Sequence, residues 1–387
     1  MPEFCENGTT FFRWTTDKRK HETSLRNQFA GPGGSSCWLV GGGPSLKQAD
    51  IELLNASPAP KMCINLAGAG LIRPTFWTSY DPTSRFLRSV YLDAGVMKFV
   101  HRRRAMDIVP ETTFKVCECP NLYFFEGDSQ RGFNDFLSQS HRTIVDWNDS
   151  MVQAIDILYQ LGFRTVYLLG CEMRISASEE MIEFARQRNV EYRPEKLLGD
   201  FVKECEAKGI SKTELASLQS PEQYHFEQQK SFEATISTDF HYFRVAQFLR
   251  LSREAISLAG MKLISVTPGS LLNDYFETIN QAEASQRILE SVGDPGKEQT
   301  AGRYTDDRVR LPKLGGMMRD FQPLHWSQKT VEQKVEPPGK KRQVINTKPQ
   351  PMVDEADIQV ERGVAPELLK EELERMKKYP VQIENEG

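Results

Sequence analysis

The sequence lacks any apolar run long enough to cross a bilayer, and its first residues lack the basic and then apolar pattern of a secretory signal. These absences lead us to expect a cytoplasmic protein without a membrane span. The chain also lacks a strong excess of one charge, because 49 Lys and Arg face 53 Asp and Glu, for a net charge of −4. Nucleic acid is therefore not an expected partner.

Cysteine offers no disulfide framework. The chain has 7 cysteines, and an odd number placed largely in apolar runs predicts reduced, buried thiols. Cys117 and Cys119 are spaced too closely for a zinc knuckle or for C-x-x-C redox chemistry. No D-x-D motif is present to demand a divalent ion. We therefore expect no metal site and no resident cofactor.

The two commonest phosphate-binding loops are also missing, although a glycine-rich loop is present. An apolar strand runs from Cys37 into Gly41, Gly42 and Gly43, followed by Pro44 and Ser45. No Gly-Lys-Ser/Thr ends this loop, and the third glycine of G-x-G-x-x-G is missing, which disfavours P-loop NTPases and NAD dehydrogenases.

The glycines nevertheless let the backbone approach a ligand closely, and Pro44 suits the first turn of a helix. The free N–H groups of such a turn favour a phosphate. The loop therefore predicts a nucleotide site. The alternative is a tight strand-to-helix turn that binds nothing.

Alternating strands and helices predict an α/β fold, a Rossmann-like doubly wound and mostly parallel sheet. The clearest unit is a helix from Ser150 to Leu161, ended by Gly162 and followed by an apolar strand over 165–170. A helix over 45–55 and another over 241–259 are also expected. The other expected strands span 37–41, 61–65, 76–80, 96–100, 113–117 and 262–266.

Composition divides the chain into three parts. We predict an N-terminal extension over 1–35, the Rossmann-like nucleotide-binding domain over 36–290, and a polar tail over 291–387. The tail has the composition of a largely disordered segment, with a short helix at 366–378. A charged, helical stretch over about 174–235 interrupts the domain, and we interpret it as an inserted lid.

Polar residues follow several of the predicted strands directly. They are Ser45, Asn65, Asp81, Glu172 and the segment from Thr267 to Ser270. In open α/β sheets, ligands bind beyond the carboxyl ends of the strands. These residues, distant in sequence, are therefore expected to line one crevice.

The ordered motifs Val40-Gly-Gly-Gly-Pro-Ser-Leu46, Ile64-Asn65, Tyr80-Asp81-Pro82 and Leu168-Leu-Gly-Cys-Glu172 resemble the DUF115/MptE-like superfamily, which includes flagellin-modifying proteins and hydroxymethylpterin pyrophosphokinases. The same motifs, with His241-Tyr242 and Pro268-Gly-Ser-Leu-Leu272, are similar to the bacterial sialyltransferases of glycosyltransferase family 42, which use CMP-sialic acid. The resemblance covers roughly residues 36–280.

The resemblance implies roles for individual residues. The loop from Gly41 to Ser45 would hold the nucleotide phosphates, and Asn65 would contact the sugar–phosphate region. Ser150 would lie near the donor, and Ser270 would touch the phosphate or nucleotide. His241 would be the catalytic base, with Tyr242 beside it. Gly170 corresponds to the glycine of a strand-end motif in the family.

Direct interpretation of the residues adds alternatives. Asp81 and Glu172 would bind a ribose, base or acceptor hydroxyl, or would merely end strands. Asp239 would orient His241 unless that histidine caps the helix that it begins, and His225 is an alternative base.

Three functions follow from these patterns. The favoured one is a metal-independent glycosyltransferase with a nucleotide-sugar donor, a CMP-sugar above others. The second is a Mg²⁺-dependent pyrophosphokinase in which Asp81 and Glu172 bind the metal. The third is a non-catalytic nucleotide-binding or interaction protein. The sequence leaves open the acceptor, which could be a glycan, a protein or another hydroxyl compound, and whether the chain forms a homo-oligomer.

Overall fold

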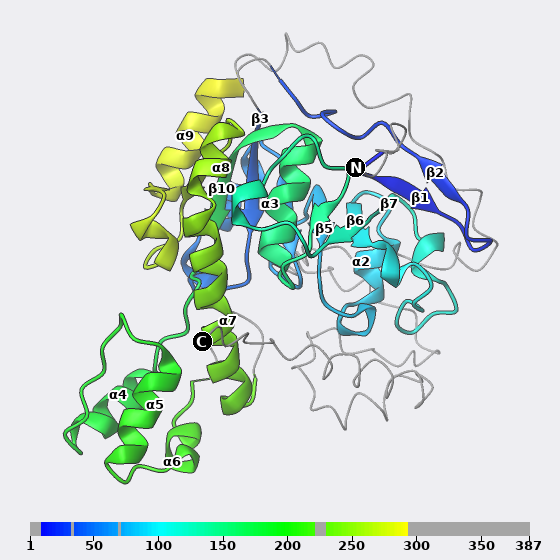
Figure 1. Ribbon diagram of the computed structural model, residues 1–387. Helices are drawn as coiled ribbons and strands as arrows, with labels where there is room; N and C mark the ends of the chain where they lie inside the picture. The colour runs from blue at the N-terminus through cyan, green and yellow to red at the C-terminus, as the bar shows by residue number, and fades with distance from the viewer. Residues whose placement is uncertain (1–8, 32–34, 69–70, 221–229, 293–387) are drawn as a thin grey trace, which may run out of the picture.

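A ten-stranded sheet forms the centre of the computed structural model, which describes residues 9–31, 35–68, 71–220 and 230–292 (Figure 1). Its strand order is β12-β11-β10-β3-β4-β5-β6-β7-β1-β2. The strands are β1 (Phe12–Trp14), β2 (Lys20–Glu22), β3 (Ser35–Val40), β4 (Lys61–Ile64), β5 (Phe76–Thr78), β6 (Met97–His101), β7 (Leu122–Phe125), β10 (Phe163–Leu169), β11 (Lys262–Ser265) and β12 (Glu277–Thr278). A separate parallel pair joins β8 (Gly127–Asp128) to β9 (Ile144–Val145).

The sheet is parallel from β12 to β7, and only the pairs made by β1 are antiparallel. The predicted α/β class with a mostly parallel sheet is therefore confirmed. Residues 12–22 of the predicted N-terminal extension form β1 and β2 at one edge of this sheet. Their apolar residues lacked a periodicity long enough to predict strands.

Helices cover both faces of the sheet. The α-helices of the described residues are α1 (Ile51–Ala56), α2 (Arg88–Leu92), α3 (Ser150–Leu161), α4 (Glu179–Arg186), α5 (Leu198–Ala207), α6 (Lys212–Ser217), α7 (Phe232–Leu251), α8 (Arg253–Leu258) and α9 (Gln281–Val292). Helices α3, α7 and α8 pack on one face, and α1, α2 and α9 pack on the other.

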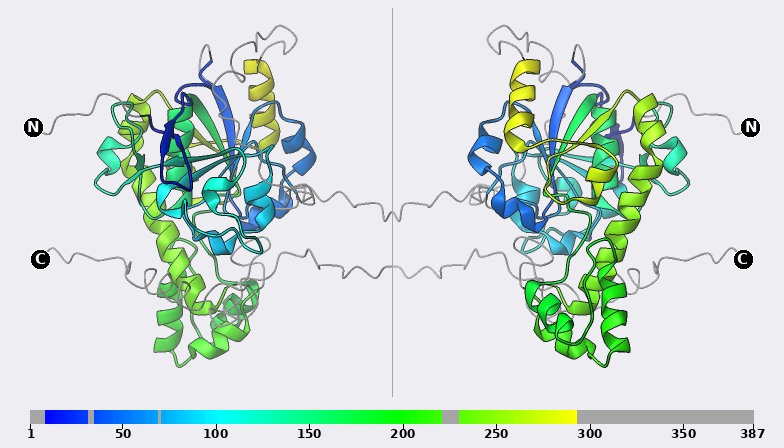
Figure 2. Two further views of the ribbon diagram at one scale, coloured as in Figure 1. Left: turned by 90° about the vertical axis from the view of Figure 1, so that its right-hand side faces the viewer. Right: turned by 90° about the vertical axis from the view of Figure 1, so that its left-hand side faces the viewer.

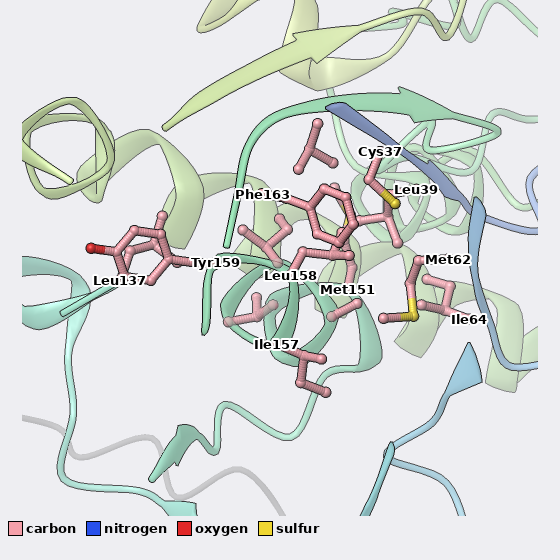
Figure 3. Packing of buried hydrophobic residues seen from close by; sticks show 14 of the residues in the cluster. Cys37, Leu39, Met62, Ile64, Leu137, Met151, Ile157, Leu158, Tyr159 and Phe163 are labelled. Carbon is pink, nitrogen blue, oxygen red and sulfur yellow. The ribbon is translucent and has the colours of Figure 1, made fainter. Parts of the chain in front are cut away.

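The central strands are apolar on both faces because each face is covered. In β3, Cys37 and Leu39 join the core beneath α3, whereas Trp38 and Val40 join the opposite core. Figure 3 shows Leu39 of β3 and Met62 of β4 in one cluster with Met151 and Leu158 of α3. Every residue of α3 is buried, so this helix is fixed on all sides.

The helical insert has a small core of its own. Apolar residues of α4, α5 and α6 pack with Phe232, at the start of α7. In Figures 1 and 2 these helices lie beyond the end of the sheet, and α7 runs from them to the sheet. The helical character expected for about 174–235 is present in its described residues.

Several predicted elements are wrong in detail. Residues 113–117 form no strand; the strand is β7, and Val116–Glu118 is a 3-10 turn. The helix expected over 45–55 is a 3-10 helix, Pro44–Gln48, followed by α1, because Asp50 starts a new helix by accepting a hydrogen bond from Leu53 N. The helix expected over 241–259 begins nine residues earlier, at Phe232, after the cap Ser231.

The six described cysteines are buried and free, as predicted. Of the tail predicted over 291–387, residues 291 and 292 belong to α9, and the remainder, with its predicted helix at 366–378, lies outside the described residues. Among the described helices, none combines the length and apolar character needed to span a bilayer.

Candidate functional site

A cleft opens where the strand order reverses, between β3 and β10. From β3 the chain builds the sheet outward through β4 to β7, and then returns to the other side of β3 with β10. Such a switch point leaves a crevice beyond the carboxyl ends of the strands. The space in the cleft and the open solvent at its mouth together amount to about 530 Å³. The lining residues are Gly41, Gly42, Gly43, Pro44, Ile64, Asn65, Asp149, Ser150, Met151, Gly170, Cys171, Glu172, Met173, Arg174 and Tyr242.

The glycine loop and the end of β10 pack backbone against backbone. Gly41 N donates to Leu169 O at 2.8 Å, and Gly43 N donates to Gly170 O at 2.9 Å. A Cβ on Gly41 would lie only 2.4 Å from Gly170 O. Gly170 itself adopts φ +68°, a left-handed conformation that favours glycine. These two glycines are therefore required by the fold.

Gly43 leaves room for a side chain and not for backbone. Its φ of −67° suits any residue, but a Cβ there would lie 1.5 Å from Oε2 of Glu172. The other carboxylate oxygen, Oε1, accepts a hydrogen bond from Ser45 N at 2.6 Å. Burial raises the pKa of Glu172, because the ionised carboxylate loses hydration there. The carboxylate thus occupies the hollow side of the glycine loop.

Asn65 follows β4 and forms hydrogen bonds that connect three segments at this edge of the sheet. Its φ of +54° turns the chain after β4, and its backbone carbonyl accepts from Trp77 Nε1 at 2.8 Å. Its side-chain oxygen accepts from Ser79 Oγ at 2.6 Å and from Ser150 Oγ at 2.9 Å. With that oxygen occupied, the Asn65 NH₂ group is the part of the amide left to donate to a ligand.

The N-terminus of α3 faces the same cleft. Asp149 caps the helix, its Oδ1 accepting from Met151 N at 2.8 Å and Val152 N at 2.9 Å. Its second oxygen, Oδ2, lies 3.1 Å from Nε2 of His241. Asp149 lines the cleft, whereas the predicted base His241 is not a lining residue and adjoins the cleft through this contact. The His241 side chain is 34% exposed and that of Asp149 only 10% exposed.

This arrangement corrects two expectations about His241. The histidine does not begin a helix but lies within α7. Asp239 does not orient it, because the Asp239 carboxylate accepts hydrogen bonds from Ile175 N at 2.6 Å and Leu198 N at 2.8 Å. Those bonds attach α7 to the helical insert. Asp149 takes the place expected of Asp239.

The predicted site residues divide by position. Gly41, Gly42, Gly43, Pro44, Asn65, Ser150, Gly170, Glu172 and Tyr242 line the cleft, and Ser45 adjoins it through Glu172. Asp81 does not line it and pairs with Arg85 at 3.2 Å.

Ser270 also lies away from the cleft wall. It is buried behind the wall, where its hydroxyl donates to Cys171 O at 2.6 Å. It therefore supports the strand end instead of facing a ligand. His225, the alternative base, lies outside the described residues.

Sequence interpretation did not predict six of the lining residues as site residues: Ile64, Asp149, Met151, Cys171, Met173 and Arg174. Asp149 has the sequence pattern of a helix cap, but its pairing with His241 has no local signature. Arg174 is a cationic side chain of the lining, and its Nη1 donates to Pro194 O at 3.4 Å. Met173 adopts φ +53°, which turns the chain sharply between Glu172 and the insert. Within the described residues, no group of three or more His, Cys, Asp or Glu side chains is arranged to hold a metal.

Comparisons with known proteins identify no family. No protein-family model matches the chain, and no curated protein matches it either. One solved structure, the sialyltransferase CstII from Campylobacter jejuni in complex with the substrate analogue CMP-3FNeuAc, aligns with a TM-score of 0.29 and 16% identity, over 63% of this chain and 86% of that one. So distant a likeness carries no argument about chemistry, and the resemblance to the DUF115/MptE-like superfamily stays a prediction.

Proposed function

We propose that this protein is a glycosyltransferase that uses a nucleotide-sugar donor, a CMP-sugar above others, and needs no metal ion. The observation that carries the proposal is the contact of His241 with Asp149, a residue that lines the cleft together with the glycine loop. A loop that can bind phosphate and a histidine–carboxylate pair are two parts that transfer of a sugar from a nucleotide to a hydroxyl can use.

The glycine loop and its neighbours would hold the leaving group. Ser45 N, which donates to Glu172 in this structure, and the NH₂ group of Asn65 are the donors that would bind phosphate oxygens. The N-terminus of α3, a helix of 12 residues, adds a positive electrostatic potential to the same cleft. These groups stabilise the negative charge that builds up on the phosphate as the bond to the sugar breaks.

His241 would act on the acceptor. The Asp149 carboxylate favours the tautomer with a proton on Nε2, which leaves the Nδ1 lone pair free to accept a proton. As the acceptor oxygen attacks the anomeric carbon, its proton passes to Nδ1. The bond between that carbon and the phosphate oxygen then breaks, and the nucleotide leaves with the bonding electrons. Tyr242, next in sequence, lines the cleft beside this reaction.

The geometry favours this proposal over a pyrophosphokinase that uses Asp81 and Glu172 as metal ligands. The two residues follow β5 and β10, and β3 and β4 lie between these strands. Three strand spacings separate their ends by roughly 14 Å. Asp81 also pairs with Arg85, and Glu172 with Ser45 N. One metal ion could not bridge them in this arrangement.

The proposal is tested with CMP-sialic acid and related nucleotide-sugars in the presence of EDTA. We expect slow release of the free nucleotide by hydrolysis and faster release with a suitable acceptor. The variant His241→Gln should bind the donor but lose at least about 10²-fold of the release rate. A release rate that requires Mg²⁺, or that His241→Gln leaves unchanged, would contradict the proposal.

A further inference from the structure

Glu172 fills the place in the glycine loop where an anion would bind. Its Oε1 takes the N–H of Ser45 at 2.6 Å. Its Oε2 occupies the space that a side chain on Gly43 would need, 1.5 Å from the position of a Cβ there. A phosphate group held by the same loop would need both the N–H of Ser45 and this space. Carboxylate and phosphate therefore exclude each other.

The carboxylate is only partly compensated in this position. Its Oε2 atom is buried without a hydrogen-bond partner in the described part of the chain. The N–H and the hydroxyl of Ser45 favour the ionised carboxylate and offset part of the cost of burial. Arg174, the cation two residues further on, directs its Nη1 to Pro194 O at 3.4 Å. Burial accordingly raises the pKa of Glu172. Release of the carboxylate to water would restore its hydration.

The backbone beneath Glu172 is fixed, so only its side chain is free to leave. Leu271 N donates to Glu172 O at 2.9 Å, and Cys171 N donates to Thr267 Oγ1 at 3.0 Å. Rotation about the side-chain bonds of Glu172 would empty the loop without moving β10. The exchange thus requires no change of fold.

We propose that Glu172 is an internal competitor, whose carboxylate occupies the phosphate position of the loop and must leave before a nucleotide phosphate binds. The inference rests on the proposed function, because it takes a nucleotide as the ligand. Glu172 then lowers the affinity for phosphate-bearing ligands and leaves the affinity for the nucleoside unchanged. This sets it apart from a residue that contacts ribose or base.

The test compares Glu172→Ala and Glu172→Gln with the wild-type protein by calorimetric titration with CMP and with cytidine. Glu172→Ala removes both the charge and the side chain from the loop and should bind CMP about tenfold more tightly. Glu172→Gln keeps a side chain of the same size that can still accept a hydrogen bond from Ser45 N, so it should gain less. Cytidine affinity should change less than about twofold. Glu180→Gln is the matched control, because Glu180 is exposed in the first turn of α4 and its substitution removes the same charge. Unliganded melting curves establish that each variant is folded.

The outcomes separate the two proposals. Tighter CMP binding by Glu172→Ala, with cytidine unchanged, supports the internal competitor. Weaker or equal CMP binding by folded Glu172→Ala overturns it and leaves the proposed function standing, since the carboxylate would then not compete with the nucleotide phosphate. If neither the wild-type protein nor a folded variant binds CMP or a CMP-sugar, the proposed function fails first and the inference fails with it.

Discussion

His241 Nε2 lies 3.1 Å from Asp149 Oδ2, although the two residues are 92 positions apart. One residue comes from α7 and the other caps α3, so the contact joins a helix continuous with the insert to a helix that is buried on all sides. Asp149 also accepts two backbone hydrogen bonds through its other oxygen. The carboxylate that orients the proposed base is thereby held rigidly.

Asp149→Asn tests this orientation without removing the helix cap. Asparagine caps helices about as well as aspartate, so the melting temperature should change little. The lost negative charge should reduce the rate of nucleotide release from the donor by at least about 10²-fold. Asp50→Asn, at the cap of α1, is the matched control and should leave the rate unchanged. Equal rates for Asp149→Asn and the wild-type protein would remove Asp149 from the mechanism.

Alanine at Gly43 should weaken CMP binding, whereas alanine at Gly41 should lower the stability of the fold. At Gly43 the new methyl group meets only the movable end of Glu172, so the variant should fold normally but bind CMP at least about tenfold more weakly, because the methyl group fills the phosphate space. At Gly41 it meets the backbone of Gly170, so stability should fall by about 1–3 kcal/mol. Melting curves and CMP titrations of both variants test these two expectations. A Gly43→Ala protein that binds CMP normally would show that the phosphate binds elsewhere.

The buried ion pair of Arg131 and Asp156 should stabilise α3. Asp156 Oδ2 accepts from Arg131 Nη1 at 2.9 Å and from Val145 N at 2.8 Å, and both charged side chains are almost fully buried. Asp156→Ala leaves the guanidinium buried and unpaired, which should lower the free energy of unfolding by about 3–5 kcal/mol. Asp200→Ala, which breaks the exposed pair with Lys203, should cost under about 0.5 kcal/mol. If urea denaturation gave similar losses of unfolding free energy for Asp156→Ala and Asp200→Ala, the stabilising role of the buried ion pair would be contradicted.

Lys98 should make the stability depend on pH. It is fully buried, donates to the carbonyls of Asp93 and Val96, and has its pKa lowered by burial from 10.5 to about 7. Between these values the unfolded chain binds more protons than the folded one. The free energy of unfolding should therefore rise with pH through this window, by up to about 1.4 kcal/mol per pH unit.

The buried thiols, whose pKa is raised, act in the opposite direction above about pH 9. The effect of Lys98 on the unfolding free energy is therefore best measured by urea denaturation between pH 7 and pH 9. The difference in unfolding free energy between wild type and Lys98→Met should change over that range. A constant difference would show that Lys98 keeps its ordinary pKa in the fold.

The sequence predicted the parts of the fold that local patterns determine. Helix α3 begins and ends at the predicted residues, because Ser150 follows the capping Asp149 and Gly162 adopts φ +109°. The strands around the glycine loop were also predictable, because their apolar runs are buried on both faces. In contrast, α7 begins with the cap Ser231, nine residues before the predicted start, in a stretch that resembled the charged insert.

The contacts of the cleft were less predictable. Glu172 was expected either to bind a ligand or to end a strand in water, but the pairing of Leu169 with Val40 aligns β10 and β3 so that its carboxylate enters the glycine loop. The pairing of His241 with Asp149 likewise depends on where α7 crosses the N-terminus of α3. Neither contact leaves a signature in the neighbouring sequence, because each depends on tertiary packing.

The most direct test of the account is calorimetric titration of the wild-type protein with CMP in EDTA, compared with cytidine and with ATP in the presence and absence of Mg²⁺. We predict saturable binding of CMP without metal, weaker binding of cytidine, and loss of CMP binding in Gly43→Ala. Binding of ATP only with Mg²⁺, or no binding of any nucleotide by the folded protein, would contradict the proposal that this cleft holds the nucleotide of a sugar donor.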